Sequence, residues 1–208
     1  MELYLARHGQ TDWNVGDRYQ GTYDEPLNAR GLEQAIELAA AVPRHIQQIV
    51  VSPMKRAQQT AAPVIAALHV PSLTHAAFRE RGFGRWEGLT YAEARELDTE
   101  LFDRGGIFSF DEQPPGAEPL HDLVKRTGDG VRDIAQLFPQ QSVLLIAHGF
   151  VIRALRLQLE GLQPGDLWNM PKPMNGELFH YSGERMLRWL AADSSAVAGK
   201  PAPTGGLL

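Results

Sequence analysis

The chain has 208 residues, 43% of them hydrophobic, and a formal net charge of −5. This length and composition predict a single domain over residues 1–192 with one sizeable core, followed by an Ala-, Gly-, Ser- and Pro-rich tail over residues 193–208 that we expect to be disordered. The acidic balance, without any Lys- or Arg-rich block, argues against a nucleic-acid or anionic-membrane partner, and the lack of cysteine excludes disulfides, thiolate catalysis and cysteine-ligated metal clusters.

The start of the sequence shows no pattern of a signal peptide. Met1 is followed at once by a strand pattern, without a basic region and a long apolar stretch, and no window approaches the length of a membrane span. We therefore expect a cytoplasmic protein that has no membrane partner.

The first predicted strand is a short apolar run that leads directly into Arg7, His8 and Gly9. The run is too short for a helix, and the glycine lets the backbone turn away, so we expect His8 at the carboxyl end of a buried strand. Open α/β sheets keep their chemistry at that edge. His8 is therefore a candidate nucleophile.

A helix is predicted after Asn28, whose side chain suits an N-cap, and Pro43 ends it. Its inward face is expected to carry Leu32, Ile36 and Ala39 or Ala40, which recur at helical spacing.

A second buried strand is predicted at Ile49–Val51, followed by Ser52 and Pro53. Serine before proline is typical of an N-cap and a first helical position, so a helix is expected from Met54, with Arg56 in its first turn near exposed amide donors.

The middle of the chain carries a loose strand after Pro71 and then an aromatic- and glycine-rich segment from Phe78 to Gly88, which we interpret as an ordered active-site loop. Thr90 and Glu93 form a capping box that opens a helix to about Asp103. Residues 105–119 are predicted to be a flexible cover. A long helix follows, and its inward residues are expected to be Leu120, Val124, Val131, Ile134 and Leu137.

A third strand, Val143–Ala147, ends at His148 and Gly149, so the order strand, histidine, glycine occurs twice. A helix is expected over residues 151–159, and residues 177–181 and 186–190 are predicted to form a terminal hairpin. Strands that alternate with helices predict an α/β fold, a three-layer α/β/α sandwich with a mostly parallel central sheet and a final antiparallel element.

These residue types together suit phosphoryl transfer. A neutral imidazole can attack phosphorus and leave again, and the planar forks of Arg7 and Arg56 match phosphate oxygens. Asn14 adds a neutral donor, and His148, if protonated, adds a donor and positive charge. Each residue alone has an ordinary structural explanation; the conjunction of two His-Gly units with two arginine motifs favours a phosphate pocket.

The chain resembles the histidine phosphatase superfamily, in the branch of cofactor-independent phosphatases and cofactor-dependent phosphoglycerate mutases. The motifs that carry the resemblance fall in the family's order and span nearly the whole chain. They are Arg7 to Asn14, Gln20-Gly21, Pro26 to Ala35, Ser52 to Ala61, Glu80 to Gly88, Gly116 to Glu118, and Ala147 to Arg153.

The resemblance implies a phosphoglycerate mutase-like fold and a set of roles. His8 is implied to become phosphorylated, and the phosphate pocket is implied to contain Arg7, Asn14, Arg56, His148 and Gly149. Glu80 is implied to be the proton donor, with Glu87 as its nearest rival. Gln20 and Gly21 either touch the substrate or only shape their loop, and the role of Glu118 stays open because Pro119 stands where serine is common.

The sequence favours hydrolysis over mutase activity. Mutases of this family carry a tyrosine and a nearby lysine for the substrate carboxylate, whereas this chain has Phe83 and Trp86 there, and no lysine between Lys55 and Lys125. We therefore expect a phosphatase that acts on small phosphomonoesters without a metal or cofactor. A phosphoglycerate mutase, or a phosphate-ester-binding protein without turnover, are the alternatives.

Two further expectations concern the surroundings of the site. Core packing or a substrate mouth explains the aromatic residues Trp86, Phe83, Phe108, Phe110 and Trp168. The remaining histidines show no paired spacing with carboxylates, which argues against a metal site; they are His45, His69, His75, His121 and His180.

Overall fold

The computed structural model describes residues 1–198, except the side chains of Trp168 and of residues 193–198. Its centre is one five-stranded sheet in the order β3-β2-β4-β1-β5. The strands are β1 Glu2–Arg7, β2 Gln48–Val51, β3 Ser72–Thr74, β4 Ser142–Ala147 and β5 Leu178–Tyr181. The first four run parallel, and β5 pairs antiparallel with β1, which confirms the predicted sheet.

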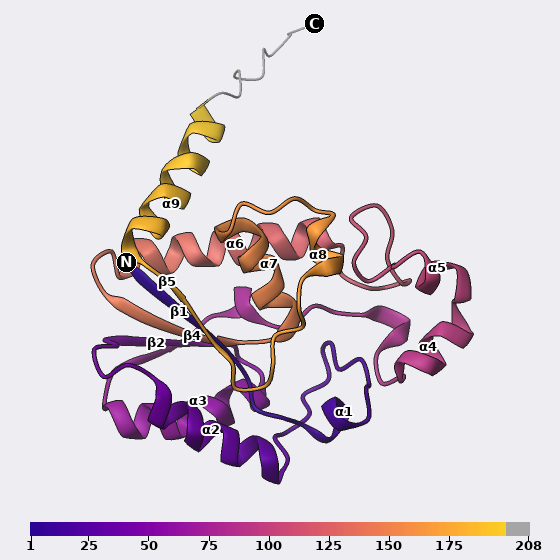
Figure 1. Cartoon of the computed structure of the whole chain (residues 1–208), viewed down its shortest axis with the longest axis horizontal. Coiled ribbons are helices and arrows are strands. Elements are labelled where there is room, and N and C mark those ends of the chain that lie inside the picture. The colour runs from indigo at the N-terminus through magenta and orange to yellow at the C-terminus, as the bar shows by residue number, and fades with distance from the viewer. Residues whose placement is uncertain (199–208) are drawn as a thin grey trace, which may run out of the picture.

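Helices cover both faces of this sheet (Figure 1). On one face lie α2 Ala29–Ala41 and α3 Lys55–Leu68; on the other lie α6 Leu120–Leu137, α7 Gly149–Leu159 and α9 Gly183–Ala198. Successive residues of β1 point to opposite layers: Leu3 and Leu5 pack with α6 and α7, whereas Tyr4 and Ala6 pack with α2 and α3. This arrangement confirms the three-layer α/β/α class. It also explains the apolar run of β1, because a strand buried on both faces needs apolar side chains on both.

Short elements gather near the carboxyl edge of the parallel strands. They are α1 Asp12–Val15, α4 Tyr91–Leu97, α5 Thr99–Asp103, α8 Asp166–Asn169, and two 3₁₀ turns, η1 Ala76–Phe78 and η2 Gly84–Trp86. A separate apolar cluster that includes Tyr19, Phe83 and Trp86 packs α4, α5 and η2 together, whereas Phe78 of η1 and Leu167 of α8 belong to the core beside α6 and α7. The capping box of Thr90 and Glu93 is present as predicted.

The predicted terminal hairpin is wrong. Residues 178–181 are a strand, but their partner is β1, and residues 186–190 belong to α9. Met186 is fully buried, and Trp189 and Leu190 pack beside the same core at helical spacing. The helix also continues to Ala198, past the predicted tail boundary at residue 193; residues 199–208 lie outside the described residues.

The predicted inward face of the first long helix is wrong at two positions. Asn28 caps α2 as expected and the predicted Ala39 is buried, but Leu32 and Ile36 are 48% and 65% exposed. The other buried positions are Gly31, Ala35 and Leu38. Glycine and alanine at three of the four buried positions let α2 pack closely against its neighbours.

Two further helix predictions need correction. The helix predicted from Thr90 to Asp103 breaks at Asp98, which ends α4 and accepts a hydrogen bond from the Trp86 indole at 2.6 Å. In α6, Leu137 is 60% exposed, whereas Leu123 and Thr127 are buried. Gly130 lies inside this helix. A larger residue would not fit there, because its Cβ would meet the Ala77 Cβ at 2.7 Å.

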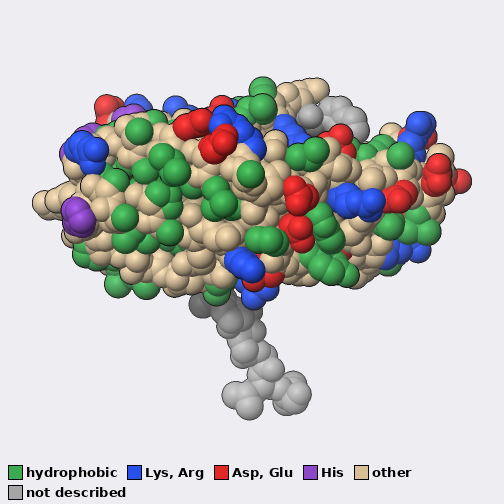
Figure 2. Space-filling view, turned by 90° about the horizontal axis from the view of Figure 1, so that it is seen from below, with side chains coloured by type: hydrophobic (Ala, Val, Ile, Leu, Met, Phe, Trp, Pro, Cys, Tyr) green, Lys and Arg blue, Asp and Glu red, His purple; other side chains and the backbone are tan. Residues whose placement is uncertain are grey.

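The surface agrees with the composition. On the face drawn in Figure 2, Lys and Arg side chains are interspersed with Asp and Glu and do not gather into one block. Within residues 1–198, no helix combines the length and the apolar character needed to cross a membrane.

Candidate active site

A cavity of about 290 Å³ opens at the carboxyl edge of β1 and β4. Since parallel strands end at the same edge, the register that places Arg7 opposite Ala147 brings both His-Gly units together there. Eight of the nine predicted site residues line the cavity, and His148 is the exception. The eight are Arg7, His8, Asn14, Gln20, Gly21, Arg56, Glu80 and Gly149.

His8 has the geometry of a neutral nucleophile. Its Nδ1 lies 2.7 Å from the carbonyl oxygen of Gly9, which can only accept, so Nδ1 carries the proton and Nε2 keeps its lone pair. Burial lowers the pKa of His8 well below its ordinary value, and the nearby charges of Arg56 and Arg7 lower it further. The imidazole is therefore neutral around pH 7.

The backbone after His8 is held rigidly by α2 and α3. The Gly9 N–H donates to Thr60 Oγ1 at 3.0 Å, and a Cβ on Gly9 would lie 2.4 Å from the Gly31 carbonyl oxygen. The Asn28 N–H donates to the Gln10 carbonyl at 3.0 Å. The sequence motif around Asn28 and Gly31 thus supports the loop that presents His8.

Arg7 and Gly149 enclose space suited to an anion. The Arg7 side chain is only 6% exposed; its Nη1 donates to the Pro173 carbonyl at 2.6 Å, and its buried Nε has no partner among the described residues. A Cβ placed on Gly149 would lie 3.7 Å from Arg7 Nε and 3.8 Å from Glu80 Oε2. Glycine therefore leaves open the volume between a guanidinium donor and a carboxylate.

His148 lies behind the cavity and not in its wall. Its Nδ1 accepts from Arg56 Nε at 3.3 Å, so its proton is on Nε2, which donates to Ser52 Oγ at 2.6 Å. Burial, Arg56 and His8 hold the pKa of His148 well below its ordinary value. In this structure, His148 is therefore neutral, and the charged form considered from the sequence is not the one present.

Ser52 corrects another prediction. The helix α3 begins at Lys55 with Met54 as its N-cap and no side-chain capping bond, because Ser52 Oγ faces His148. Arg56 is fully buried, with Nη1 donating to the Tyr23 carbonyl and Nη2 to that of Gly21, and burial lowers its pKa to about 10. It remains a cation at neutral pH.

Glu80 spans both halves of the site. Its Oε1 accepts from the Arg81 N–H at 3.0 Å, and its Oε2 accepts from the Phe150 N–H at 3.3 Å, at the positive end of α7. Among the described residues that line the cavity, Glu80 is the single carboxylate.

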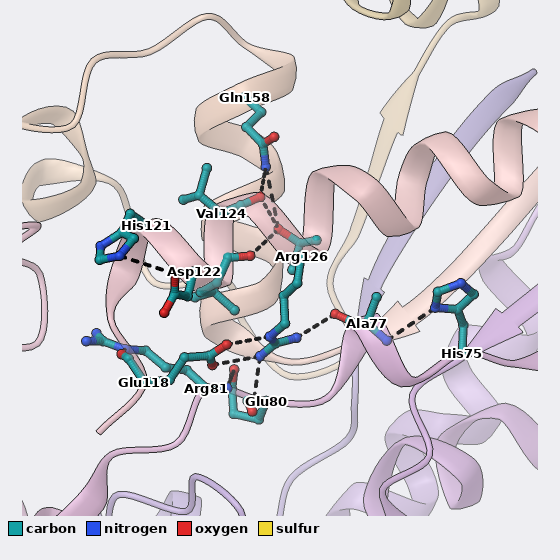
Figure 3. A network of polar contacts seen from close by, with 12 residues as sticks. His75, Ala77, Glu80, Arg81, Glu118, His121, Asp122, Val124, Arg126 and Gln158 are labelled. Atoms are coloured by element: carbon teal, nitrogen blue, oxygen red, sulfur yellow. Dashed lines mark hydrogen bonds and ion pairs between the residues drawn. The ribbon is translucent and has the colours of Figure 1, made fainter. Parts of the chain in front are cut away.

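A polar network behind Glu80 holds its backbone (Figure 3). Arg126 of α6 pairs through Nε and Nη2 with the carboxylate of Glu118, and its Nη2 also donates to the Glu80 carbonyl at 3.4 Å. Arg81 is fully buried and donates to the carbonyls of Glu118 and Ile107, which ties the predicted cover to the Glu80 segment. Glu118 thus binds Arg126 and does not line the cavity.

Glu87, the rival proton donor, points elsewhere. Its Oε1 accepts from the N–H groups of Thr22 and Phe83 at 2.8 and 3.0 Å, and its Oε2 accepts from Thr22 Oγ1 at 2.6 Å. Gly21, with φ of +50°, passes so close that a Cβ would overlap the Glu87 carboxylate. This geometry favours a structural role for Glu87, and Gly21 both shapes the loop and lines the cavity.

Asn14 and Gln20 also face the cavity. Asn14 Oδ1 accepts from the Thr11 N–H at 3.1 Å and from Asn175 Nδ2 at 3.2 Å, which leaves the Asn14 amide nitrogen for a ligand. Gln20 is 7% exposed, and its Oε1 has no partner among the described residues. The Asn175 amide also donates to the His8 carbonyl at 2.9 Å, a support that the sequence did not reveal.

The rest of the cavity wall was mostly missed by sequence reasoning. Phe83 and Phe108 line it as considered; Trp86 is buried in the apolar cluster, Phe110 lines a separate groove, and the Trp168 side chain lies outside the described residues. The unforeseen residues are Arg18, Tyr19, Tyr91, Phe102, Ile107, Phe150, Arg153 and Lys172. Arg153 had a usable signal, because it follows Gly149 by four residues and shares its helix face; Lys172 had none.

Histidines outside the cavity pair with carboxylates through space. His45 and His180 lie 3.3 and 2.7 Å from the carboxylate of Glu2, a pairing that sequence spacing did not reveal. In the described part of the chain, no group of three or more His, Asp or Glu side chains has an arrangement that could hold a metal ion.

Residues 3–189 match the family model described as the histidine phosphatase superfamily, branch 1. The chain is 37% identical over 161 residues to the uncharacterized phosphatase PhoE of Bacillus subtilis (strain 168), covering 77% of this chain and 78% of that protein. It is 32% identical over 164 residues to a metal-independent phosphoserine phosphatase of Arabidopsis thaliana, covering 76% of this chain and 68% of that protein.

The fold has close counterparts among solved structures. A mycobacterial glucosyl-3-phosphoglycerate phosphatase in complex with VO3 superposes with a TM-score of 0.80 and 29% sequence identity, covering 87% of this chain and 90% of that one. A match over most of both chains agrees with the fold class derived above.

Proposed function

Because the chain belongs to the histidine phosphatase superfamily, branch 1, we propose that it hydrolyses small phosphomonoesters through a phosphohistidine formed on His8. The observation that carries this proposal is the state of His8: its Nδ1 proton is held by the Gly9 carbonyl, so Nε2 is an unprotonated nucleophile in a cavity with several cations and one carboxylate. The phosphatase relatives support the reaction class.

In the first step, the lone pair of His8 Nε2 attacks phosphorus while the bond from phosphorus to the ester oxygen breaks. Protonated Glu80 gives its proton to the leaving alkoxide, so the alcohol departs neutral. In the second step, the Glu80 carboxylate takes a proton from water, the water oxygen attacks phosphorus, and the phosphorus–nitrogen bond breaks. His8 returns to its neutral form and inorganic phosphate is released.

The cations stabilise the transferring phosphoryl group. Arg7 offers the buried Nε that has no protein partner, and Asn14 offers its amide nitrogen. Arg56 contributes positive charge at the inner wall, where His148 Nδ1 accepts from its Nε. His148 is therefore proposed to act by orienting Arg56 and not by touching the ester.

The reaction needs no metal ion or cofactor in this scheme, because Arg7 and Arg56 supply the positive charge that a metal would otherwise provide. Hydrolysis of phenyl phosphate in the presence and absence of EDTA tests this part. Equal rates are expected, and a loss of activity that added Mg²⁺ or Zn²⁺ restores would contradict it.

The covalent step is tested by trapping. The enzyme is mixed with a radiolabelled phosphomonoester, quenched in denaturant and alkali, in which phosphohistidine survives, and the labelled peptide is identified by mass spectrometry. Label is expected on His8, absent from His8→Ala, and unchanged in His121→Ala, an exposed histidine that serves as the matched control. Equal labelling of His8→Ala would reject the proposal.

A mutase is the second candidate, and one observation favours it: Lys172 brings a lysine to the cavity, although the segment between Lys55 and Lys125 has none. A mutase would convert 3-phosphoglycerate to 2-phosphoglycerate faster than it releases phosphate. We expect phosphate release to dominate. A chain that binds phosphomonoesters but neither transfers nor releases phosphate would instead be a binding protein.

A further inference from the structure

Two cations in the outer part of the cavity have no carboxylate to balance them. Five cationic side chains line the cavity against the single carboxylate of Glu80. Arg18 is paired with Glu93 at 3.2 Å, and Arg7 and Arg56 lie around His8. Neither Arg153 nor Lys172 lies within ion-pair distance of a carboxylate in the described part of the chain. A phosphate dianion at His8 leaves both of them unbalanced.

Arg153 is held in place by contacts that do not neutralise it. The side chain is 7% exposed, and its Nη1 donates to the Leu167 carbonyl at 3.0 Å. The guanidinium carbon lies 5.1 Å from the ring centre of Phe108 and 5.9 Å from that of Phe150. Keeping a buried guanidinium without a carboxylate is costly, so a site with this composition suits an anionic ligand.

The pKa of Arg153 depends on its burial and on the neighbouring charge of Arg7. Burial lowers the pKa of Arg153 to about 10, and the charge of Arg7 acts in the same direction. Both arginines are influenced by Tyr91 and Glu80, which places them in one electrostatic neighbourhood. Arg153 nevertheless stays protonated at pH 7, so it can attract an anion.

Lys172 is carried by a segment that is tied to the reaction centre. The next residue, Pro173, accepts the hydrogen bond from Arg7 Nη1, and Asn175 donates to the carbonyl of His8. Lys172 Nζ lies 3.4 Å from the Tyr91 hydroxyl and 5.7 Å from the centre of its ring. The position of this ammonium is therefore coupled to the same residues that position the phosphate.

We propose that Arg153 and Lys172 form a second anion subsite, which selects phosphomonoesters whose alcohol part carries another anionic group. The phosphate would lie at His8, Arg7 and Arg56, and the carbon chain would pass along the rings that separate the two charged regions. Those rings belong to Tyr91, Phe108 and Phe150. This inference rests on the proposed phosphatase activity and adds its substrate class.

Matched substrate pairs test the selectivity. In each pair the anionic member is compared with an analogue that lacks only the second anion: 3-phosphoglycerate with glycerol 3-phosphate, and phosphoserine with phosphoethanolamine. Since the neutral member forgoes a charge-assisted hydrogen bond, kcat/KM is expected to be at least about tenfold higher for the anionic member. Fructose 1,6-bisphosphate against fructose 6-phosphate shows whether a second phosphate is also accepted.

Substitutions test the assignment to these two residues. Lys172→Met and Arg153→Gln are each expected to lower the anionic-to-neutral ratio of kcat/KM about tenfold, mainly through KM, and Arg153→Lys is expected to restore part of it. Lys125→Met is the matched control, because Lys125 is an exposed lysine of α6 that pairs with Asp129 and does not line this cavity, and it should leave the ratio unchanged. If Arg153→Gln fails to fold, Lys172→Met still provides the test, because Lys172 is exposed and its replacement should not disturb folding.

The outcomes separate this inference from the proposed function. Two outcomes would overturn the second subsite and leave the phosphatase proposal standing, provided that substrate is hydrolysed and His8 is labelled. One is equal kcat/KM within each substrate pair, and the other is an anionic-to-neutral ratio that Lys172→Met leaves unchanged. No hydrolysis of any pair member by a protein that also fails to label His8 would reject both.

Discussion

The two strand-end His-Gly units look alike in the sequence but differ in what surrounds them. His8 lines the cavity with one nitrogen bonded to its own backbone, whereas His148 is enclosed and has both nitrogens bonded to protein groups. The glycines differ in the opposite sense. Gly9 is pressed against the Gly31 carbonyl, whereas Gly149 faces open space between Arg7 and Glu80.

This difference shows how one sequence pattern serves two purposes. In the first unit, the histidine is the proposed nucleophile and the glycine is needed for packing. In the second, the histidine supports Arg56 and the glycine leaves room for the ligand. The ring centres of the two histidines lie 5.1 Å apart, so the roles are separated by orientation and bonding and not by distance.

Replacing the histidines one at a time is expected to have the largest effect. His8→Gln removes the nucleophile and should lower kcat for 4-nitrophenyl phosphate by about 10⁴-fold or more, while His148→Gln should lower it by about 10²-fold, because it disturbs only the orientation of Arg56. Rapid-quench trapping should still detect phosphohistidine in His148→Gln. An equal loss of label in both variants would erase the distinction between the units.

Replacing Glu80 tests whether this carboxylate is the proton donor. It lies beside the second unit, where its Oε2 accepts a hydrogen bond from the Phe150 N–H. Glu80→Gln should lower kcat/KM for glycerol 3-phosphate by about 10²- to 10³-fold but affect 4-nitrophenyl phosphate much less, because nitrophenolate leaves without a proton. Glu87→Gln is the matched control and should preserve the wild-type dependence on the leaving group. A much larger loss with glycerol 3-phosphate than with 4-nitrophenyl phosphate in Glu87→Gln, together with the wild-type leaving-group dependence in Glu80→Gln, would reverse the assignment.

Replacing the glycines by alanine should separate stability from activity. Gly9→Ala forces a methyl group against a backbone carbonyl and is expected to lower the free energy of unfolding by about 2 kcal/mol. Gly149→Ala should change it by less than about 1 kcal/mol, since alanine suits a helix, yet reduce kcat/KM at least about tenfold. Urea titration and steady-state kinetics measure both; a destabilised Gly149→Ala with normal activity would contradict the contrast.

The remaining prediction concerns how stability, and not activity, depends on pH. Both histidines are buried in the neutral form, and their pKa values are depressed in the folded state. Below the ordinary histidine pKa near 6.5, the unfolded chain therefore binds more protons than the folded chain. The free energy of unfolding should therefore fall as the pH drops below about 6.5, by about 1.4 kcal/mol per pH unit for each histidine, until the folded pKa values are passed.

Urea titrations between pH 7.5 and pH 5 measure this slope in the wild type and in His148→Gln. The variant should lose about half of the slope that the two histidines produce together. A slope that is unchanged in the variant would show that His148 is not buried in the neutral form.

Much of the site could be predicted because its residues end consecutive parallel strands. Arg7, His8 and Gly149 had to meet once the strands were recognised, Arg56 followed from the helix expected after the second strand, and the resemblance supplied Glu80. Packing was harder to predict. Leu32 and Ile36 looked like an inward face, but the smaller Gly31 and Ala35 are buried, since close helix approach depends on shape.

Local patterns were enough to predict the parallel strands, the two helical layers and most of the residues at the carboxyl edge of the sheet, because strand periodicity and motif order are visible within short stretches of the chain. The packed structure was needed to establish which histidine faces the cavity, that Glu87 and not Glu80 shapes a loop, and that Lys172 approaches Tyr91. Those outcomes depend on hydrogen bonds and burial between segments far apart in the chain, which no local pattern encodes.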